Sequence, residues 1–481
     1  MIPYVIKTFR GGVSDENDKG VSGSFKHGHS LDIHSRDDVL KCGSSMTTIN
    51  ETTVDSLIQF FVAANDGSTY GFSDTGKVFS IAGSTDDPVV SLKYTNTNGK
   101  IRGASVWGIS DGGSTSTYLF WSTDTSIARK LLPGDDAWGD VSENWRATLD
   151  GADWHTMMPA SGYLMVANRE YLASIDYVND GTFNNAAMNI RPGNLIKAIE
   201  ERDDTVILGS YRTDNEEEGH LWAWQVTATN WIQKKRIPIK GVNAMINAEL
   251  MLMQGGSDGE LLFSDFVNAV PLHAIPGKGE VLPGATAIQN KLAMFGVSTS
   301  DYPGIWSYGR TKKNRPFALN YEYRLAKTVA GSSVSTVGAI SVVNGNMFAS
   351  WGTTDGSTSD YGVDMVSATT RANAIYEGLE FDQGLPAIKK IIDTVKLNMV
   401  ELPSGTSVSV KFKTNKQSAW QYAVLGSGST TFSESGQNEV IFSIGAPAMV
   451  WELGVDLTAS GSSTPEVLAI TGYLANERYE F

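Results

Sequence analysis

Cysteine, long apolar runs and positive charge are scarce in this chain of 481 residues. Cys42 is the only cysteine, so no internal disulfide and no cluster of thiolate metal ligands can form. The longest apolar stretch, LIQFFVAA at residues 57–64, is far shorter than a membrane span. The opening segment MIPYVIKTFRGG lacks the apolar core of a signal peptide. We therefore expect neither membrane insertion nor secretion.

Basic residues are outnumbered by acidic ones. Lys and Arg total 38 against 53 Asp and Glu, which gives a formal net charge of −15. A surface of this sign repels phosphate backbones and anionic lipid headgroups. The composition therefore argues against sequence-specific binding of nucleic acids and against attachment to an anionic membrane.

Glycine and aromatic residues, in contrast, are abundant. The chain has 49 Gly, 17 Tyr and 12 Trp, and 41% of its residues are hydrophobic. Many aromatic residues combined with frequent tight-turn residues are typical of β-sheet proteins. The composition predicts a globular, all-β fold.

A weak repeat runs through the middle of the sequence. Each copy has a short apolar strand, a Gly, Asp-Gly or Asn-Gly turn, and a second, aromatic strand. Successive copies start 41 to 54 residues apart, at Ile58, Ile101, His155, Ile196, Val242, Ala285 and Val337. This spacing suits four-stranded propeller blades. It predicts a seven-bladed β-propeller over residues 46–384. A large sandwich or a β-helix is the competing interpretation, although the period is too long and irregular for a β-helix.

The pattern changes to strict alternation near Gly384. In TSVSVKFKT, Val408, Val410 and Phe412 share one face of a strand, with Ser409, Lys411 and Lys413 on the other face. In VWELGVDLT the inward set is predicted to be Trp451, Leu453, Val455 and Leu457. Residues 385–481 are therefore predicted to form an antiparallel β-sandwich.

Residues 1–45 fit neither pattern. They are rich in Gly, Ser and charge, which predicts an extended arm that becomes ordered by lying on another surface. Within HGHSLDIHSRDD at residues 27–38, His27 and His29 share one strand face and His34 points away. Metal ligands must converge, so this stretch favours a packed or solvated arm over a metal site.

Enzyme signatures are weak. FSDTGKVF at residues 72–79 and GGSDGELLFSD at residues 255–265 resemble sialidase Asp-box turns but have the wrong spacing. Acidic loops at residues 132–140 and 214–220 are more typical of solvated turns than of Ca²⁺ sites. The sequence also has no nucleophile elbow, phosphate loop or His-Glu-x-x-His motif. We expect no catalytic residues, no metal, no cofactor and no enzymatic activity.

Three tryptophans are candidates for stacking against sugars. Trp222 and Trp224 share one face of a strand, and Trp231 follows nearby. Burial between propeller blades explains the same spacing and is the favoured interpretation. A glycan-binding platform remains the alternative.

The segment FRGGVSDENDKGVSGSFKHGHSLDIHSRDDVLKCGSSM at residues 9–46 resembles the start of structural proteins from tailed-bacteriophage virions. There, an arm of the form GG…D…GxxGSF…LDIR…L precedes a β-propeller. The matching positions are Gly11, Gly12, Gly23, Ser24, Phe25, Leu31, Asp32, Ile33 and Leu40. His34 departs from the pattern, which has a basic residue there. LPSGTSVSVKFKTN at residues 402–415, Trp420 and the terminal LAITGYLANERYEF also resemble these proteins.

The resemblance implies a non-enzymatic structural protein of the virion, most often a ring, nozzle or hub of the tail. It implies a docking arm whose candidate interface residues are Gly11, Gly12, Phe25, Leu31, Asp32 and Ile33. Expected partners are other virion proteins and further copies of the chain in a ring, after synthesis in the host cytoplasm. A carbohydrate-binding propeller, used for receptor recognition or descended from a glycosidase, is the alternative function.

Overall fold

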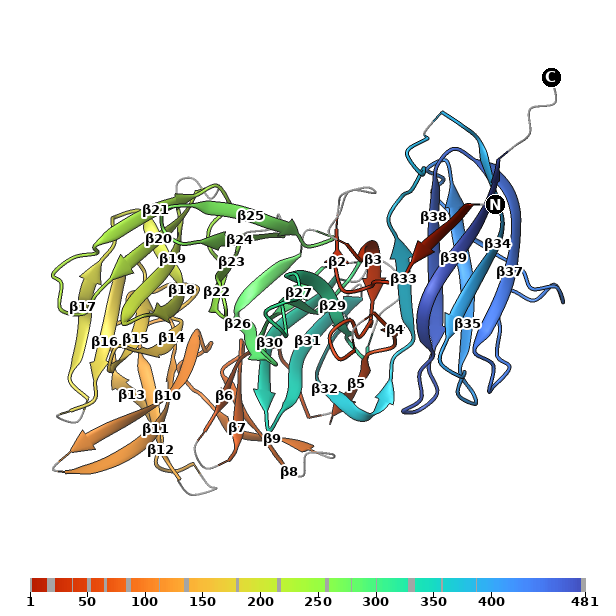
Figure 1. Ribbon diagram of the computed structural model, residues 1–481. Helices are drawn as coiled ribbons and strands as arrows, with labels where there is room; N and C mark the ends of the chain where they lie inside the picture. The colour runs from red at the N-terminus through yellow and green to blue at the C-terminus, as the bar shows by residue number, and fades with distance from the viewer. Residues whose placement is uncertain are drawn as a thin grey trace. The chain divides into compact units, whose positions relative to one another are not determined.

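In the computed structural model every regular element is a β-strand, and the described residues contain no helix (Figure 1). The structure describes residues 2–14, 22–36, 38–49, 53–64, 67–83, 88–111, 113–133, 138–178, 181–213, 218–255, 259–277, 279–299, 301–327, 334–355, 358–385 and 387–476. A search of these residues accordingly finds no helical membrane span. The prediction of an all-β chain is confirmed.

Sheets of four strands follow one another along the middle of the chain, and the described residues form seven of them. The first three are β6 (Ile58–Ala63), β7 (Thr69–Ser73), β8 (Lys77–Gly83) and β9 (Pro88–Thr95); β10 (Gly103–Asp111), β11 (Ser114–Ser122), β12 (Ile127–Leu132) and β13 (Ser142–Arg146); and β14 (Met157–Ala160), β15 (Tyr163–Asn168), β16 (Tyr171–Asp176) and β17 (Phe183–Asn189).

The next three are β18 (Asn194–Arg202), β19 (Thr205–Arg212), β20 (Gly219–Trp224) and β21 (Gln233–Ile237); β22 (Ala244–Asn247), β23 (Met251–Gly255), β24 (Glu260–Ser264) and β25 (Ala269–Ala274); and β26 (Glu280–Gln289), β27 (Leu292–Ser298), β28 (Gly304–Gly309) and β29 (Ala318–Arg324). Each predicted repeat begins within or next to the first strand of one sheet. The repeat was visible because neighbouring strands pair through local hairpins.

The last four-stranded sheet combines three strands that follow the other sheets in sequence with one strand that precedes them all. β30 (Val334–Val343), β31 (Asn346–Asp355) and β32 (Thr358–Arg371) are joined by β5 (Ser44–Ile49), which precedes the first sheet in sequence. A buried carboxylate reinforces this junction, because Asp364 accepts hydrogen bonds from Thr48 Oγ1 at 2.8 Å and Trp351 Nε1 at 2.7 Å. The sheet is thus completed by a strand about 300 residues away.

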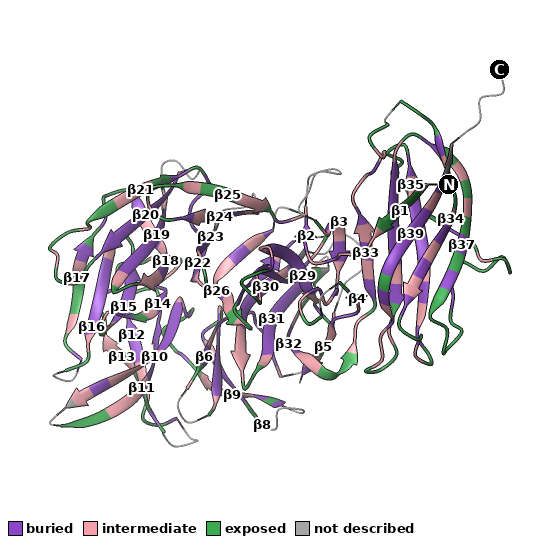
Figure 2. Ribbon diagram, viewed as in Figure 1, coloured by how far each residue is buried: buried purple, intermediate pink, exposed green. Residues whose placement is uncertain are grey.

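The first strands of successive sheets lie side by side, from β6 through β10, β14, β18, β22 and β26 to β30, and β30 also contacts β6. Second and third strands such as β15, β20 and β27 are buried along most of their length (Figure 2). Indole rings fill the space among them, and Trp121, Trp222, Trp306 and Trp351 are fully buried. Aromatic burial of this kind is the main stabilising term in such sheets.

Two further sheets contain the C-terminal strands. One has the order β1 (Ile2–Ile6), β39 (Glu466–Asn476), β34 (Lys390–Met399) and β37 (Glu439–Ala448), with β4 (Leu40–Lys41) also paired to β39. The other has the order β2 (Gly12–Val13), β3 (Ser24–His29), β33 (Ala374–Gly378), β38 (Trp451–Thr458), β35 (Ser407–Thr414) and β36 (Gln421–Tyr422).

The predicted alternation in these sheets is confirmed on the inward face. Val408, Val410 and Phe412 are buried, and so are Trp451, Leu453, Val455 and Leu457. The opposite face is not uniformly exposed, because Lys411, which lies there as predicted, is 4% exposed. Its ammonium group is neutralised by Glu377 Oε1 at 2.8 Å and Asp456 Oδ1 at 3.0 Å, which permits a cation to be buried.

The chain divides into two compact units. One comprises Met1–Met46, Trp306–Arg324 and Val366–Phe481, and the other comprises Thr47–Ile305 and Leu325–Met365. These units do not follow the boundaries predicted at residues 45 and 384. Residues of the predicted arm form strands in the same unit as the C-terminal sheets, because the backbone groups of β1 and β3 pair with β39 and β33.

Candidate functional site

A polar network lies where the first strands of several sheets begin. Lys197, near the start of β18, donates to Asn243 Oδ1 at 2.8 Å and lies 3.4 Å from Glu280 Oε1 at the start of β26. Asn243 Nδ2 also donates to Glu280 Oε1 at 3.0 Å. The Lys197 ammonium lies 5.6 Å from the ring centroid of Trp154, which precedes β14. Four neighbouring sheets therefore meet through one lysine.

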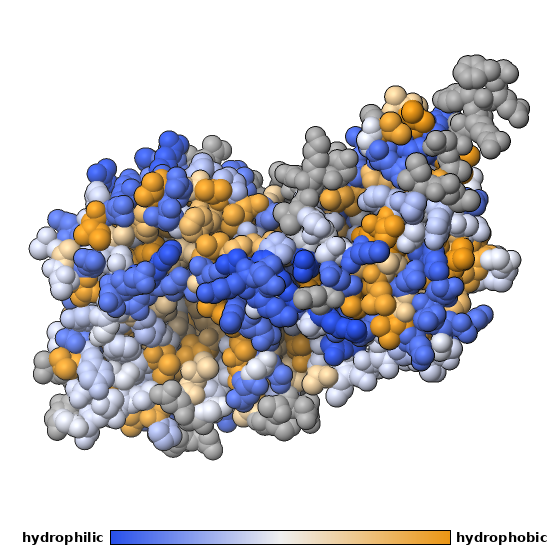
Figure 3. Space-filling model, viewed as in Figure 1, coloured by the Kyte–Doolittle hydropathy of each residue, from blue (hydrophilic) through white to orange (hydrophobic). Residues whose placement is uncertain are grey.

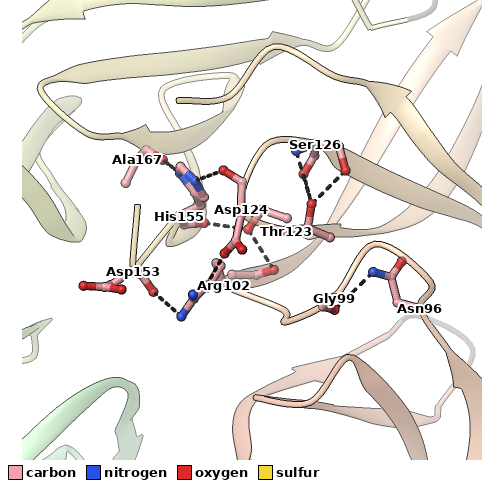
Figure 4. Close-up of polar contacts among 11 residues, drawn as sticks. Asn96, Gly99, Arg102, Thr123, Asp124, Ser126, Asp153, His155 and Ala167 are labelled. Carbon is pink, nitrogen blue, oxygen red and sulfur yellow. Dashed lines mark hydrogen bonds and ion pairs between the residues drawn. The ribbon is translucent and has the colours of Figure 1, made fainter. Parts of the chain in front are cut away.

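A second group continues the network toward β10 (Figure 4). Arg102 Nε donates to Asp124 Oδ1 at 2.7 Å, and Arg102 Nη1 donates to the carbonyl of Asp153 at 3.3 Å. Both contacts of Arg102 are made by its guanidinium group. The guanidinium joins its own sheet to the segment that leads into the next sheet.

His155 sits between two carbonyl groups in the same view. Its Nδ1 is 2.7 Å from Ala167 O and its Nε2 is 3.1 Å from Asp124 O. Burial lowers the pKa of His155, and the two carbonyl contacts oppose that shift. A neutral imidazole has one N–H and can donate to one of these carbonyls, whereas the protonated ring donates to both. His155 is a linker between sheets.

The electrostatics of the network indicate mutual neutralisation. Burial lowers the pKa of Lys197, and the nearby Glu280 carboxylate opposes this. Each cation in the network contacts a carboxylate, an amide or a backbone carbonyl of a neighbouring element. Over the described residues, no group of three or more His, Cys, Asp or Glu side chains has an arrangement that could hold a metal ion. The contacts of the side chains in this network cross-link neighbouring sheets.

The candidate arm residues occupy packed positions. Phe25, Leu31 and Ile33 are at most 2% exposed. Phe25 lies 5.6 Å from Tyr376, measured between ring centroids. A methyl group on Gly11 would lie 2.3 Å from Ser24 N, so only glycine fits against that strand. The Phe25, Leu31 and Ile33 side chains are therefore packed inside one compact unit.

Gly12 and Asp32 fix the backbone of the same segment. Gly12 has φ +75°, and a methyl group there would meet Leu319 O at 2.6 Å. Asp32 Oδ1 accepts hydrogen bonds from the backbone N–H groups of His34 and Ser35, and its Oδ2 lies 3.4 Å from Lys41 Nζ. The pKa of Asp32 is lowered because these bonds and charges outweigh its burial. The carboxylate therefore holds a turn together.

The histidine-rich stretch is distributed over separate contacts. The rings of His27 and His29 lie 6.2 Å apart on β3, and burial lowers the pKa of both, that of His29 to about 4. His34 lies 3.0 Å from Glu322 Oε1, which also accepts from Ser307 Oγ at 2.6 Å. The sequence did not indicate this buried carboxylate, because Glu322 lies almost 300 residues away.

The three candidate tryptophans do not form an exposed platform. Trp222 and Trp224 are 0% and 3% exposed, so their ring faces are unavailable to a sugar. Trp231 is half-buried, packs edge-on against Trp222 and lies under the Arg191 guanidinium. The favoured interpretation, burial between strands, describes Trp222 and Trp224.

The two acidic loops are described only in part. Residues 134–137 and 214–217 lie outside the described residues.

Comparisons with known proteins identify the kind of fold that this chain is similar to. No family model and no curated protein sequence matches it. Among solved structures, the WD40 β-propeller domain of Doa1 is 11% identical, with a TM-score of 0.43, over 67% of this chain and 96% of that one. The Dos1 propeller is 12% identical, with a TM-score of 0.38, over 68% and 88% of the two chains. U3-55K is 8% identical, with a TM-score of 0.46, over 68% and 100%.

Proposed function

We propose that the seven four-stranded sheets are the blades of one closed β-propeller. The proposal is supported by the succession of first strands, which returns from β30 to β6. It is also supported by β5, which joins the last sheet in the way that a propeller is commonly closed by one strand from the other end of the chain.

We propose further that the protein is a non-enzymatic structural component of a tailed-bacteriophage virion, as a ring, nozzle or hub of the tail. One observation carries this proposal. The N-terminal positions that resemble virion proteins are the positions with demanding packing, since Phe25, Leu31 and Ile33 are buried and Gly11 and Gly12 allow close backbone approach. A resemblance at the buried and backbone-limited positions of this segment is what a shared fold segment would produce, rather than shared surface composition alone.

The mode of assembly follows from this role. Copies of the chain form a ring through heterologous interfaces and contact other virion proteins. The net charge of −15 suits a surface beside passing DNA, because like charges prevent the DNA from adhering. The protein is made in the host cytoplasm and resides in the particle.

Purified particles of the phage whose genome encodes this chain provide the test. Quantitative mass spectrometry should find the chain at a fixed copy number per particle, and antibodies against it should label the tail in electron micrographs. A particle preparation that lacks the chain would overturn the virion role.

The alternative function, carbohydrate binding, is tested with the full-length chain on a glycan array. Selective glycan binding that is lost in Trp231→Ala, with unchanged thermal stability, would favour receptor recognition. Trp231 is the informative position because Trp222 and Trp224 are buried.

A further inference from the structure

Two hollows flank the turn between β18 and β19. The first has a volume of about 290 Å³, and its apolar wall includes Ile207, Ala223, Ile232 and Phe266. The second has a volume of about 650 Å³ and is lined mainly by polar groups, among them Ser161, Glu201, Asp204 and Thr227. The turn itself separates them, with Arg202, Asp203 and Thr205 beside the first hollow.

Both hollows lie at the opposite strand ends from the polar network described above. Lys197 is near the start of β18, whereas the turn follows its last residue, Arg202. Ile232 and Phe266 belong to the connections between β20 and β21 and between β24 and β25. The hollows and the network are therefore separate sites in the same compact unit.

Apolar side chains are exposed beside the first hollow. Ile232 is 51% exposed and Val267 is 71% exposed. Figure 3 shows hydrophobic residues (orange) at the surface over β24 and β25, between hydrophilic ones (blue). Isolated exposed aliphatic residues are ordinary on a protein surface, but here they border a cavity whose wall is partly apolar. The cavity and its border together favour an aliphatic side chain as occupant.

The charges around the turn are mostly negative. Glu201, Asp203, Asp204 and Asp265 contribute four carboxylates to the two hollows. Among the described lining residues the one cation is Arg202, 3.7 Å from the highly exposed carboxylate of Asp203, and nearby Lys235 donates to Val267 O at 2.6 Å. A basic occupant complements this surface, particularly since the whole chain carries −15.

Left-handed backbone also occurs at this place, as it does at several other turns of the described chain. Asp203 and Asp204 have φ +50° and +58°, and Phe266 has φ +67°. The left-handed conformation is unfavourable by about 1–2 kcal/mol for a residue with a side chain, and it is unusual for a bulky aromatic residue. Strain of this kind often accompanies binding sites. Asp203 and Asp204 form a two-residue hairpin turn in which positive φ is favoured, so Phe266 is the residue beside the first hollow whose conformation is unusual.

We propose that the two hollows form one docking surface for an extended, basic peptide segment of a partner protein. An aliphatic side chain of the segment enters the first hollow, and a Lys or Arg side chain crosses the turn to the carboxylates of Glu201 and Asp204 in the second. A peptide fits better than a compact small molecule, because the turn divides the space into two unlike compartments. The surface is independent of the proposed place in a virion.

Fluorescence anisotropy with the full-length chain tests the proposal. The probe is a fluorescein-labelled, amidated peptide of sequence Lys-Leu-Lys-Leu-Lys at low ionic strength. We expect saturable binding that weakens at least tenfold for Glu-Leu-Glu-Leu-Glu and for Lys-Ser-Lys-Ser-Lys. Asp203→Asn/Asp204→Asn should weaken binding about fivefold while retaining the turn, because Asn tolerates positive φ. Ile232→Asp should weaken binding more than tenfold.

Matched variants separate this surface from nonspecific attraction. Asp150→Asn/Asp393→Asn removes two exposed carboxylates elsewhere, and Val89→Asp alters a 48% exposed aliphatic residue on β9. Both should bind the probe as the unaltered chain does. No saturable binding at millimolar concentrations, equal binding of the acidic peptide, or equal losses in the matched variants would overturn the proposal.

Discussion

The two compact units organise their sheets in contrasting ways. In the unit that holds most of the repeats, a strand usually pairs with its neighbour in sequence, as Ile58 of β6 does with Ser73 of β7. In the other unit, Val5 pairs with Thr471 and Phe25 with Gly378. Local pairing produces a repeat that can be seen in the sequence, whereas distant pairing leaves no such mark. The second unit therefore depends on side chains from both ends of the chain.

Removing a side chain from the distant strands is expected to have the largest effect. Phe25→Ala should lower the free energy of unfolding by about 3–5 kcal/mol, because a fully buried ring leaves a cavity against Tyr376. Chemical denaturation followed by far-UV circular dichroism measures the change. Val5→Ala on β1, where the side chain is 40% exposed, is the control and should change stability little. Equal losses of stability in Phe25→Ala and Val5→Ala would contradict the expectation that buried positions of this segment contribute more than exposed ones.

The strand that completes the last four-stranded sheet offers the corresponding test in the other unit. Asp364→Asn should lower the free energy of unfolding by about 2–3 kcal/mol, since the buried carboxylate accepts from Trp351, Thr48 and the backbone N–H of Ala326. Thermal unfolding followed by circular dichroism measures the change. Asp360→Asn, at a half-exposed pair with Lys327, should have little effect. A neutral outcome for both would show that β5 is held mainly by its backbone.

Lowering the pH should destabilise the compact unit that contains His29, because the imidazole of His29 is buried. Burial lowers the pKa of His29 to about 4, so the unfolded state binds a proton first as the pH falls below about 6.5. Stability is thus present above pH 6.5 and is lost toward pH 4, by about 2 kcal/mol between pH 7 and pH 4.5. His29→Gln should flatten this dependence in urea titrations at several pH values. His273→Gln, at a half-buried position on β25, should leave it unchanged.

A surface pair is expected to contribute least. Arg36 contacts Glu466 at the start of β39, and the Arg36 side chain is 54% exposed. Arg36→Ala should lower the free energy of unfolding by no more than about 0.5–1 kcal/mol, and 0.5 M NaCl should abolish the difference. Differential scanning calorimetry at two salt concentrations measures it. A loss of stability that does not depend on salt would contradict this expectation, and would indicate that the Arg36–Glu466 pair helps to hold distant strands together.

Sequence patterns predicted the parts of the fold that rest on local geometry. The repeat starts fell on the first strands of successive sheets, and the alternation from Val408 to Phe412 gave the inward face correctly. Lys411 lies on the predicted face, but its burial was not predicted, because period-two patterning cannot register two carboxylates supplied by other strands. The pairing of β1 and β3 with C-terminal strands was missed for a related reason. A short segment that pairs with residues hundreds of positions away resembles a loop in composition.

The polar network was harder to predict than the fold. The contacts of Lys197, Asn243 and Glu280 were not predicted from the sequence. Their spacing of 37 to 46 residues matches the repeat rather than any short motif. A search for polar residues at equivalent positions of each repeat would have found them.

Placing β5 ahead of the first repeat has a consequence for biosynthesis. Its partner β32 begins roughly 300 residues later, so β5 leaves the ribosome well before that partner exists. At about 5–20 residues per second, the wait lasts on the order of 15–60 seconds. Throughout that interval the nascent chain presents an unsatisfied strand edge, which makes the time between translation of the two strands the period of greatest exposure to aggregation and to chaperones.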